Sequence, residues 1–209
     1  MYKEMEKYLE VNVAKEVDKG QATSDGTGSG NGPNKLNDSG ATFTASVAVG
    51  DWVYVYAVNG TPQASPHLYQ VAAVSSNTEL SLTPRGATAG QGTGVVNQGD
   101  YKIFSNTVGN NQMISCSNVA LVENLASSTA NILFDVQYGG ASGIKCRLLY
   151  GYSDTAAANE EMRNGFQSAM VQANQQNWPE ATAVWLDRES NAGVSSPMYR
   201  VLDLSLIHI

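Results

Sequence analysis

The stretch "WVYVYAVNG", residues 52–60, constrains the fold of this 209-residue chain more than any other. Aromatic and β-branched residues alternate with one another over residues 52–58, a pattern typical of a strand. Asn59 and Gly60 both tolerate positive φ and predict a type I′ turn, the commonest connection of a tight hairpin. The sequence therefore predicts two antiparallel strands that meet at this turn.

Further short strands are expected around this hairpin. The segments "LYQVAAV" and "ELSLTP" are joined by the polar turn "SSNT", and a Gly/Thr-rich stretch leads into "DYKIFS". Several short strands with turns at this spacing are typical of a small barrel or a curled sheet. We therefore predict a small β-barrel-like module over residues 41–106.

The segment before this module has the composition of a linker. Residues 7–14, "KYLEVNVA", alternate like a strand, but the following stretch is dominated by Gly, Ser, Asn, Asp and Thr. Too few apolar residues are present there to form a core, so we predict a flexible linker over residues 21–40. Its "GTGSGNG" run lacks the Gly-Lys-Ser/Thr that a phosphate-binding loop requires.

The carboxyl-terminal part predicts a different layer. Met162, Phe166 and Met170 recur at helical spacing, and Pro179 ends the helix that begins near Ser153 or Asp154. Strands are expected over residues 118–125, 130–138, 143–151, 181–187 and 197–204. The predicted fold class is therefore α+β, mostly β, with an antiparallel sheet covered by one amphipathic helix.

The last six residues, "LSLIHI", resemble the translation of a sequencing adaptor. We interpret residues 204–209 as a technical scar on a metagenomic gene and exclude them from the prediction of the fold. The alternative is a short natural apolar tail.

The composition argues against several classes of partner. Only 15% of the residues are charged, the net charge is −7, and no run of Lys or Arg is present. Nucleic-acid binding depends on such basic patches, so we expect no nucleic-acid partner. No segment has the roughly 20 apolar residues of a membrane span, and the amino terminus lacks the apolar stretch of a signal peptide. We therefore expect no membrane association.

The residues that carry most catalytic chemistry are sparse. Glu160 and Glu161 are adjacent on the predicted helix and point about 100° apart, unlike the paired acids of a hydrolase. His67 has no nucleophile motif to serve, and clustered metal ligands are missing. Cys116 and Cys146 either form a disulfide, if their strands are neighbours, or remain two unlinked thiols. We predict no catalytic residues, no metal and no cofactor.

Trp52, Tyr54 and Tyr56 are the best candidates for a contact surface. They lie on one face of the predicted strand, and Val53 and Val55 lie on the other. We favour the interpretation that the aromatic row faces the core of its own module. In the alternative, the row stacks on sugars or fills the groove of a neighbouring subunit.

Over residues 6–187 the chain resembles uncharacterised virion structural proteins of tailed bacteriophages, especially phages of aquatic bacteria. The resemblance lies in "EKYLEVNVA", "VAVGDWVYVYAV", "YQVAAVSSNTELSLTP", "GDYKIFS", "CSNVALVENLASSTANILF" and "NEEMRNGFQSAMVQANQQNW". It implies an interrupted domain, residues 1–20 plus 107–203, whose first strand pairs into the later sheet around the inserted module. The family supplies no catalytic residues.

From this resemblance we expect a non-enzymatic virion protein that is assembled in the host cytoplasm. The expected role is head-associated, as a decoration, cement or minor capsid protein that binds copies of itself and the major capsid or tail proteins. The alternatives are a module that recognises glycans or the host surface, and a tail-tube or connector subunit.

Overall fold

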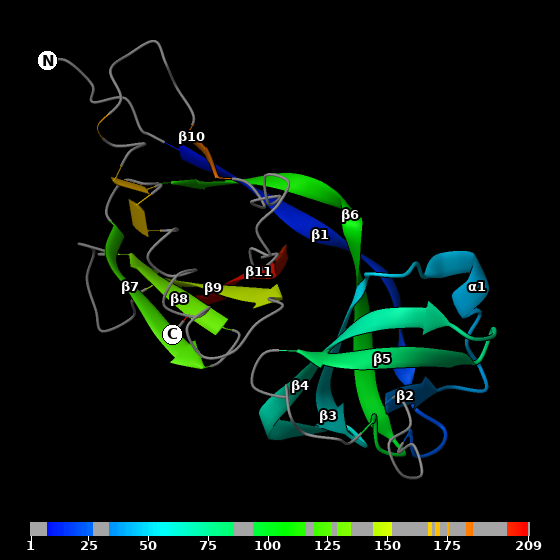
Figure 1. Ribbon diagram of the computed structural model, residues 1–209. Coiled ribbons are helices and arrows are strands. Elements are labelled where there is room, and N and C mark those ends of the chain that lie inside the picture. Colours follow the sequence, from blue (N-terminus) through cyan, green and yellow to red (C-terminus); the bar gives the residue numbers. More distant parts are fainter. Residues whose placement is uncertain are drawn as a thin grey trace, which may run out of the picture. The chain divides into compact units, whose positions relative to one another are not determined.

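The computed structural model describes residues 8–26, 34–85, 94–115, 119–126, 129–134, 144–151, 183–185 and 200–208, together with residues 167, 168, 170, 171 and 175. Within these residues the chain is mostly β, as predicted, and much of its sheet is antiparallel and curled (Figure 1). The chain divides into two compact units. The middle unit is built on Ala14–Gly109, and the flanking unit is built from the chain before and after it.

The strands of the middle unit follow the order β2–β5–β4–β3–β6–β1. Their bounds are β1 (Tyr8–Gln21), β2 (Asn34–Asn37), β3 (Trp52–Val58), β4 (Thr61–Val74), β5 (Glu79–Arg85) and β6 (Gly99–Ser115), with the short helix α1 at Phe43–Ser46. The pairs from β2 to β6 are all antiparallel. The first residues of β1 and the last of β6 belong to the flanking unit.

The predicted hairpin is confirmed between β3 and β4. Asn59 has φ 50° and Gly60 has φ 73°, the two positive values that a type I′ turn requires. The register of β3 shifts between Val55 and Ala57 against both of its neighbours. Because a β-bulge adds local twist and bends the strand, this irregularity helps the sheet to curl.

The prediction of a flexible linker over residues 21–40 is wrong for the described residues 22–26 and 34–40. Thr23 N–H donates to the Asn37 carbonyl over 2.8 Å, and Lys35 N–H donates to the Gly26 carbonyl over 2.9 Å. These bonds join the segment after β1 to β2, which carries the fully buried Leu36. Composition was misleading here because backbone hydrogen bonds, which depend little on side chains, hold this segment.

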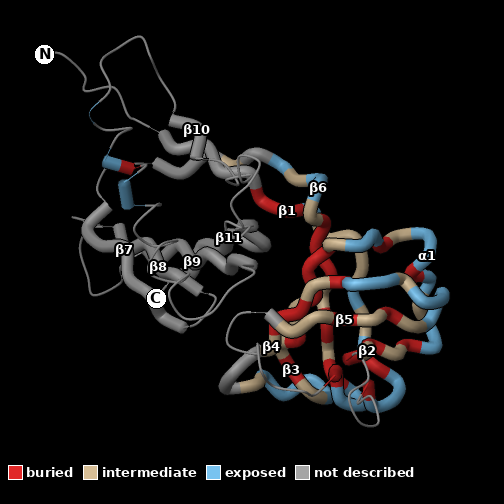
Figure 2. The backbone as a smooth tube through the Cα atoms, in the orientation of Figure 1, coloured by how far each residue is buried: buried red, intermediate tan, exposed pale blue. Residues whose placement is uncertain are grey.

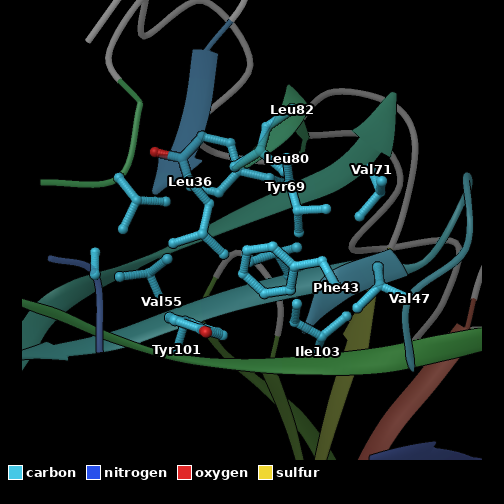
Figure 3. Close-up of a cluster of buried hydrophobic side chains, with 13 residues drawn as sticks. Leu36, Phe43, Val47, Val55, Tyr69, Val71, Leu80, Leu82, Tyr101 and Ile103 are labelled. Atoms are coloured by element: carbon cyan, nitrogen blue, oxygen red, sulfur yellow. The ribbon is translucent and has the colours of Figure 1, made fainter. Parts of the chain in front are cut away.

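Buried residues gather within the curled sheet of the middle unit (Figure 2), where side chains from α1 and five strands point toward one another (Figure 3). Its buried members are Ala22, Leu36, Phe43, Val47, Val53, Val55, Tyr69, Val71, Leu80, Leu82, Val95, Tyr101 and Ile103. Three of the largest are aromatic residues from three different elements, α1, β4 and β6.

The favoured interpretation of the β3 aromatic row, that it faces the core, is therefore wrong for Tyr54 and Tyr56, whereas Trp52 is fully buried. Val53 and Val55 are 0% and 2% exposed and belong to the core, whereas Tyr54 and Tyr56 are half-buried on the opposite, outer face. Aromatic rings from other elements fill the core cluster, to which β3 contributes only Val53 and Val55.

The flanking unit contains the remaining described strands. They are β7 (Val119–Ala126), β8 (Thr129–Phe134), β9 (Ile144–Gly151), β10 (Ala183–Trp185) and β11 (Arg200–His208). Antiparallel pairing gives the order β11–β9–β8–β7, and β1 pairs in parallel with both β10 and β11. The first strand of the chain is thus held by strands that come much later in the sequence.

Residues 204–208, which the prediction of the fold excluded, belong to a strand, and their interpretation as a scar stays a prediction. They lie within β11, where Leu204 pairs with Leu148 and Leu206 pairs with Cys146 of β9. The physical reason is the alternation of the sequence "LSLIH", which suits the period of two of a strand.

The predicted helix falls mostly outside the described residues. Residues 167, 168, 170, 171 and 175 have helical backbone, with Met170 buried and Val171 exposed. The amphipathic helix therefore stays a prediction. In the described part of the chain, no helix has the length and hydropathy needed to cross a bilayer.

Candidate functional site

Two parallel tyrosine rings on the outer face of β3 form the most distinctive surface of the middle unit. The ring centroids of Tyr54 and Tyr56 lie 6.1 Å apart, and their planes differ by 24°. The side chains share one face because successive residues of a strand alternate. Both residues are half-buried, so part of each residue is accessible. We call this pair the tyrosine platform.

A set of charged side chains lies beside the platform on β6 and β1. Lys102 is the register partner of Tyr54, and its Nζ lies 3.1 Å from Glu16 Oε2. Glu16 is also paired with Lys19, at 3.4 Å. Burial disfavours the charged form of Glu16, but the hydrogen bond and charge of Lys102, with the charge of Lys19, outweigh it and lower the Glu16 pKa.

Asp100 extends these polar groups toward the hairpin turn. Its Oδ1 accepts a hydrogen bond of 2.9 Å from Gln21 Nε2, and its Oδ2 accepts one of 2.7 Å from the Gly60 N–H. Tyr101 points into the core, so Asp100 and Lys102, its neighbours in the strand, are directed to the outer side. Glu16, Gln21, Asp100 and Lys102 are called the polar row below.

The polar row offers donors and acceptors that their own partners already orient. An ammonium group donates, two carboxylates accept, and an amide can do both. Next to two aromatic rings, such groups are suited to bind a ligand with an apolar face and several hydroxyl groups. The surface belongs wholly to the middle unit.

Trp52, the third member of the predicted contact surface, is separated from the platform by its burial. Its exposed fraction is 0%, and its indole Nε1 donates to Asn106 Oδ1 over 3.1 Å. Its register partner on β6 is Phe104, which is also buried. Trp52 therefore offers no accessible surface, and its role is to pack.

His67 contacts a phenol. Its Nδ1 lies 3.2 Å from the Tyr69 hydroxyl, and the two rings meet edge to face at 6.2 Å. Burial lowers the pKa of His67 and raises that of Tyr69 to about 12. Both groups are therefore uncharged near neutral pH, which suits a packed pair at the inner side of β4.

Asp38 and Tyr101 form a buried polar contact that sequence analysis missed. Tyr101 Oη donates to Asp38 Oδ2 over 2.7 Å, and the Gly40 N–H donates to Oδ1 over 2.9 Å. Burial and, next, Asp38 raise the pKa of Tyr101. A Cβ atom at Gly20 would lie 2.6 Å from Asp38 Oδ2, so the close approach requires glycine. Asp38 lies in the segment that its composition predicted to be a flexible linker, so a buried contact was not expected there.

The structure describes only some of the residues of the remaining predicted sites. Cys146 lies in β9, and Cys116 falls outside the described residues, so the disulfide stays a prediction. Glu160 and Glu161 also fall outside them. Where the chain is described, no three His, Cys, Asp or Glu side chains group closely enough to hold a metal ion.

No family model, curated protein or solved structure matches this chain. Its geometry and sequence therefore carry the functional argument.

Proposed function

We propose that this protein is a non-enzymatic structural component of a tailed-bacteriophage virion. The proposed role is head-associated, as a decoration, cement or minor capsid protein. The sequence resemblance over residues 6–187 supports it. So does the low content of charged residues, 15%, because a weakly charged surface suits close packing against neighbours.

One observation carries the mechanism of assembly: the sheet of the flanking unit ends at β7. In the described part of the chain, β7 (Val119–Ala126) pairs with β8 and with no other strand. An edge strand presents unpaired N–H and C=O groups, which a strand of another subunit can complete. We propose that a copy of this protein or another virion protein adds a strand at this edge.

Symmetric repetition of the same contact around the particle would make the assembly stable. A specific interface buries about 800 Å² on each partner, and closed symmetry repeats it around a ring or shell. Many equal contacts then stabilise the particle without any single one being strong.

Two finer features of the fold belong to the same proposal. We propose that residues 154–178 form an amphipathic helix that covers one face of the flanking sheet. We also propose that the β module is an insertion into an interrupted domain. Each feature would leave the margin at β7 free for assembly.

The test is the copy number of the chain in purified particles, measured by quantitative mass spectrometry. Hundreds of copies per particle are expected for a shell protein. Six or twelve copies per particle would contradict the head-associated role and indicate a connector subunit. Complete absence from particles, together with purified protein that stays monomeric at high concentration in light scattering, would refute the structural role.

A further inference from the structure

We propose that the tyrosine platform and the polar row form a binding site for a neutral sugar ring of an oligosaccharide. This site lies within the middle unit and does not depend on the assembly edge at β7. It would add recognition to a protein whose proposed role is structural.

The shape and polarity of the platform suit a sugar ring. The rings of Tyr54 and Tyr56 are close to parallel, with planes 24° apart, and both are partly accessible. A sugar ring has a face of C–H groups that packs on such aromatic surface, while its hydroxyl groups stay at the rim. Phenol hydroxyls add polar groups at the edge of the platform.

Hydrogen-bonding groups lie beside the rings and are already held in place. Lys102 is opposite Tyr54 on β6 and is held by Glu16, with 37% and 33% of the two side chains exposed. Asp100 is held by Gln21 and by the Gly60 amide. Because these partners already restrict the side chains, a ligand loses less conformational entropy when it binds them.

Charges of both signs lie in the polar row and next to it. The row holds two carboxylates, Glu16 and Asp100, and one ammonium group, Lys102, and Lys19 pairs with Glu16 from beside the row. With Lys19 the formal charges balance, so these groups do not select an anion or a cation. Vicinal hydroxyl groups, which can both donate and accept, match neighbouring carboxylates and ammonium groups.

The position of β3 argues for a small ligand over another protein strand. β3 is paired with β4 on one side and with β6 on the other, so it offers no free backbone edge for strand addition. On the outer face of β3, Trp52 is fully buried and Tyr54 and Tyr56 are half-buried, and the turn at Asn59 and Gly60 is exposed. A ligand would approach from the turn.

The experiment is a glycan array probed with the purified full-length protein, followed by titration of one captured neutral oligosaccharide. We expect Tyr54→Ala and Tyr56→Ala each to weaken binding about tenfold or more, since tenfold corresponds to about 1.4 kcal/mol. Tyr54→Phe and Tyr56→Phe, which keep the rings, should stay within about threefold. Val49→Ala, at an exposed valine outside the patch, is the matched control and should bind like the unmodified chain.

Two results would overturn the proposal. Either the array retains no neutral glycan, or the Tyr54→Ala/Tyr56→Ala double variant binds the captured glycan as tightly as the unmodified protein. If the alanine variants do not fold, Lys102→Gln decides, because it spares the rings and should weaken binding about fivefold. Unchanged binding of Lys102→Gln would then refute the site.

Discussion

Replacement of Asp51 tests how the middle unit fixes the turn before β3, residues 48–51, to strand β6. The Asp51 side chain is 3% exposed. Its Oδ2 accepts a hydrogen bond of 2.8 Å from the Ala48 N–H, and its Oδ1 accepts one of 2.9 Å from the Asn106 N–H. Asn106 in turn accepts the indole N–H of Trp52. One carboxylate therefore joins the turn before β3 to a strand some 55 residues further along the chain.

The magnitude follows from the number of bonds. A hydrogen bond to a charged group contributes about 1.5–3 kcal/mol, and Asp51→Ala leaves two backbone N–H groups without their acceptor. Val49 beside them is 66% exposed, so water reaches this turn and replaces part of the loss. We expect Asp51→Ala to lower the free energy of unfolding by about 3 kcal/mol, at the lower end of the sum. Asp51→Asn keeps one acceptor and should lose about 2 kcal/mol.

The assay is urea denaturation followed by tryptophan fluorescence, because Trp52 lies next to the affected contact. The matched control is Glu79→Gln, at a carboxylate that is 32% exposed and paired with Lys35 at 3.0 Å. Such exposed pairs contribute about 0–1 kcal/mol. Should Asp51→Ala unfold within about 0.5 kcal/mol of the unmodified protein at an unchanged m-value, the carboxylate does not hold the turn.

Further predictions address buried tyrosines and close backbone contacts. Tyr101→Phe removes a hydrogen bond to a buried carboxylate and should lower the urea midpoint by the equivalent of about 1.5–3 kcal/mol; an unchanged midpoint contradicts this. The pKa of Tyr69 is raised to about 12, so the unfolded chain loses this proton first, and stability should fall between about pH 10 and pH 12. A pH series of urea midpoints should show a smaller fall in Tyr69→Phe, and equal falls would refute it. A Cβ at Gly94 would lie 1.9 Å from the Gly26 carbonyl oxygen, so Gly94→Ala should prevent the native circular dichroism spectrum. Gly60→Ala meets no atom within 4 Å and should cost only about 1–2 kcal/mol for its positive φ; equal effects of the two variants would contradict this account.

Local pattern predicted the strands well where both periodicity and turn chemistry were strong. The predicted strand over residues 52–58 is β3 with the same bounds, and the Asn59–Gly60 turn has the predicted backbone. The strand over residues 79–84 is β5 with one further residue. In these places the alternation of side chains and the permitted φ values of a dipeptide specify the structure without help from distant residues.

Segments whose structure depends on distant backbone were not predictable in the same way. The short strand β2 carries only one large apolar residue, Leu36, and its backbone hydrogen bonds are made with β5, with residues 22–26 and with Val95. Likewise β1 and β6 extend well beyond the predicted segments 7–14 and 100–105. A polar sequence forms a strand when neighbouring strands offer partners, because burial of unpaired backbone groups is unfavourable.

The candidate site shows the same division. The sequence by itself determined that Tyr54 and Tyr56 share a face, since residues of a strand alternate with period two. Only the tertiary structure decided which face is outside, because the rings of Phe43, Tyr69 and Tyr101 fill an interior of limited volume. Alternation is a property of one strand, whereas the choice of the buried face depends on how side chains from every packed element share one space.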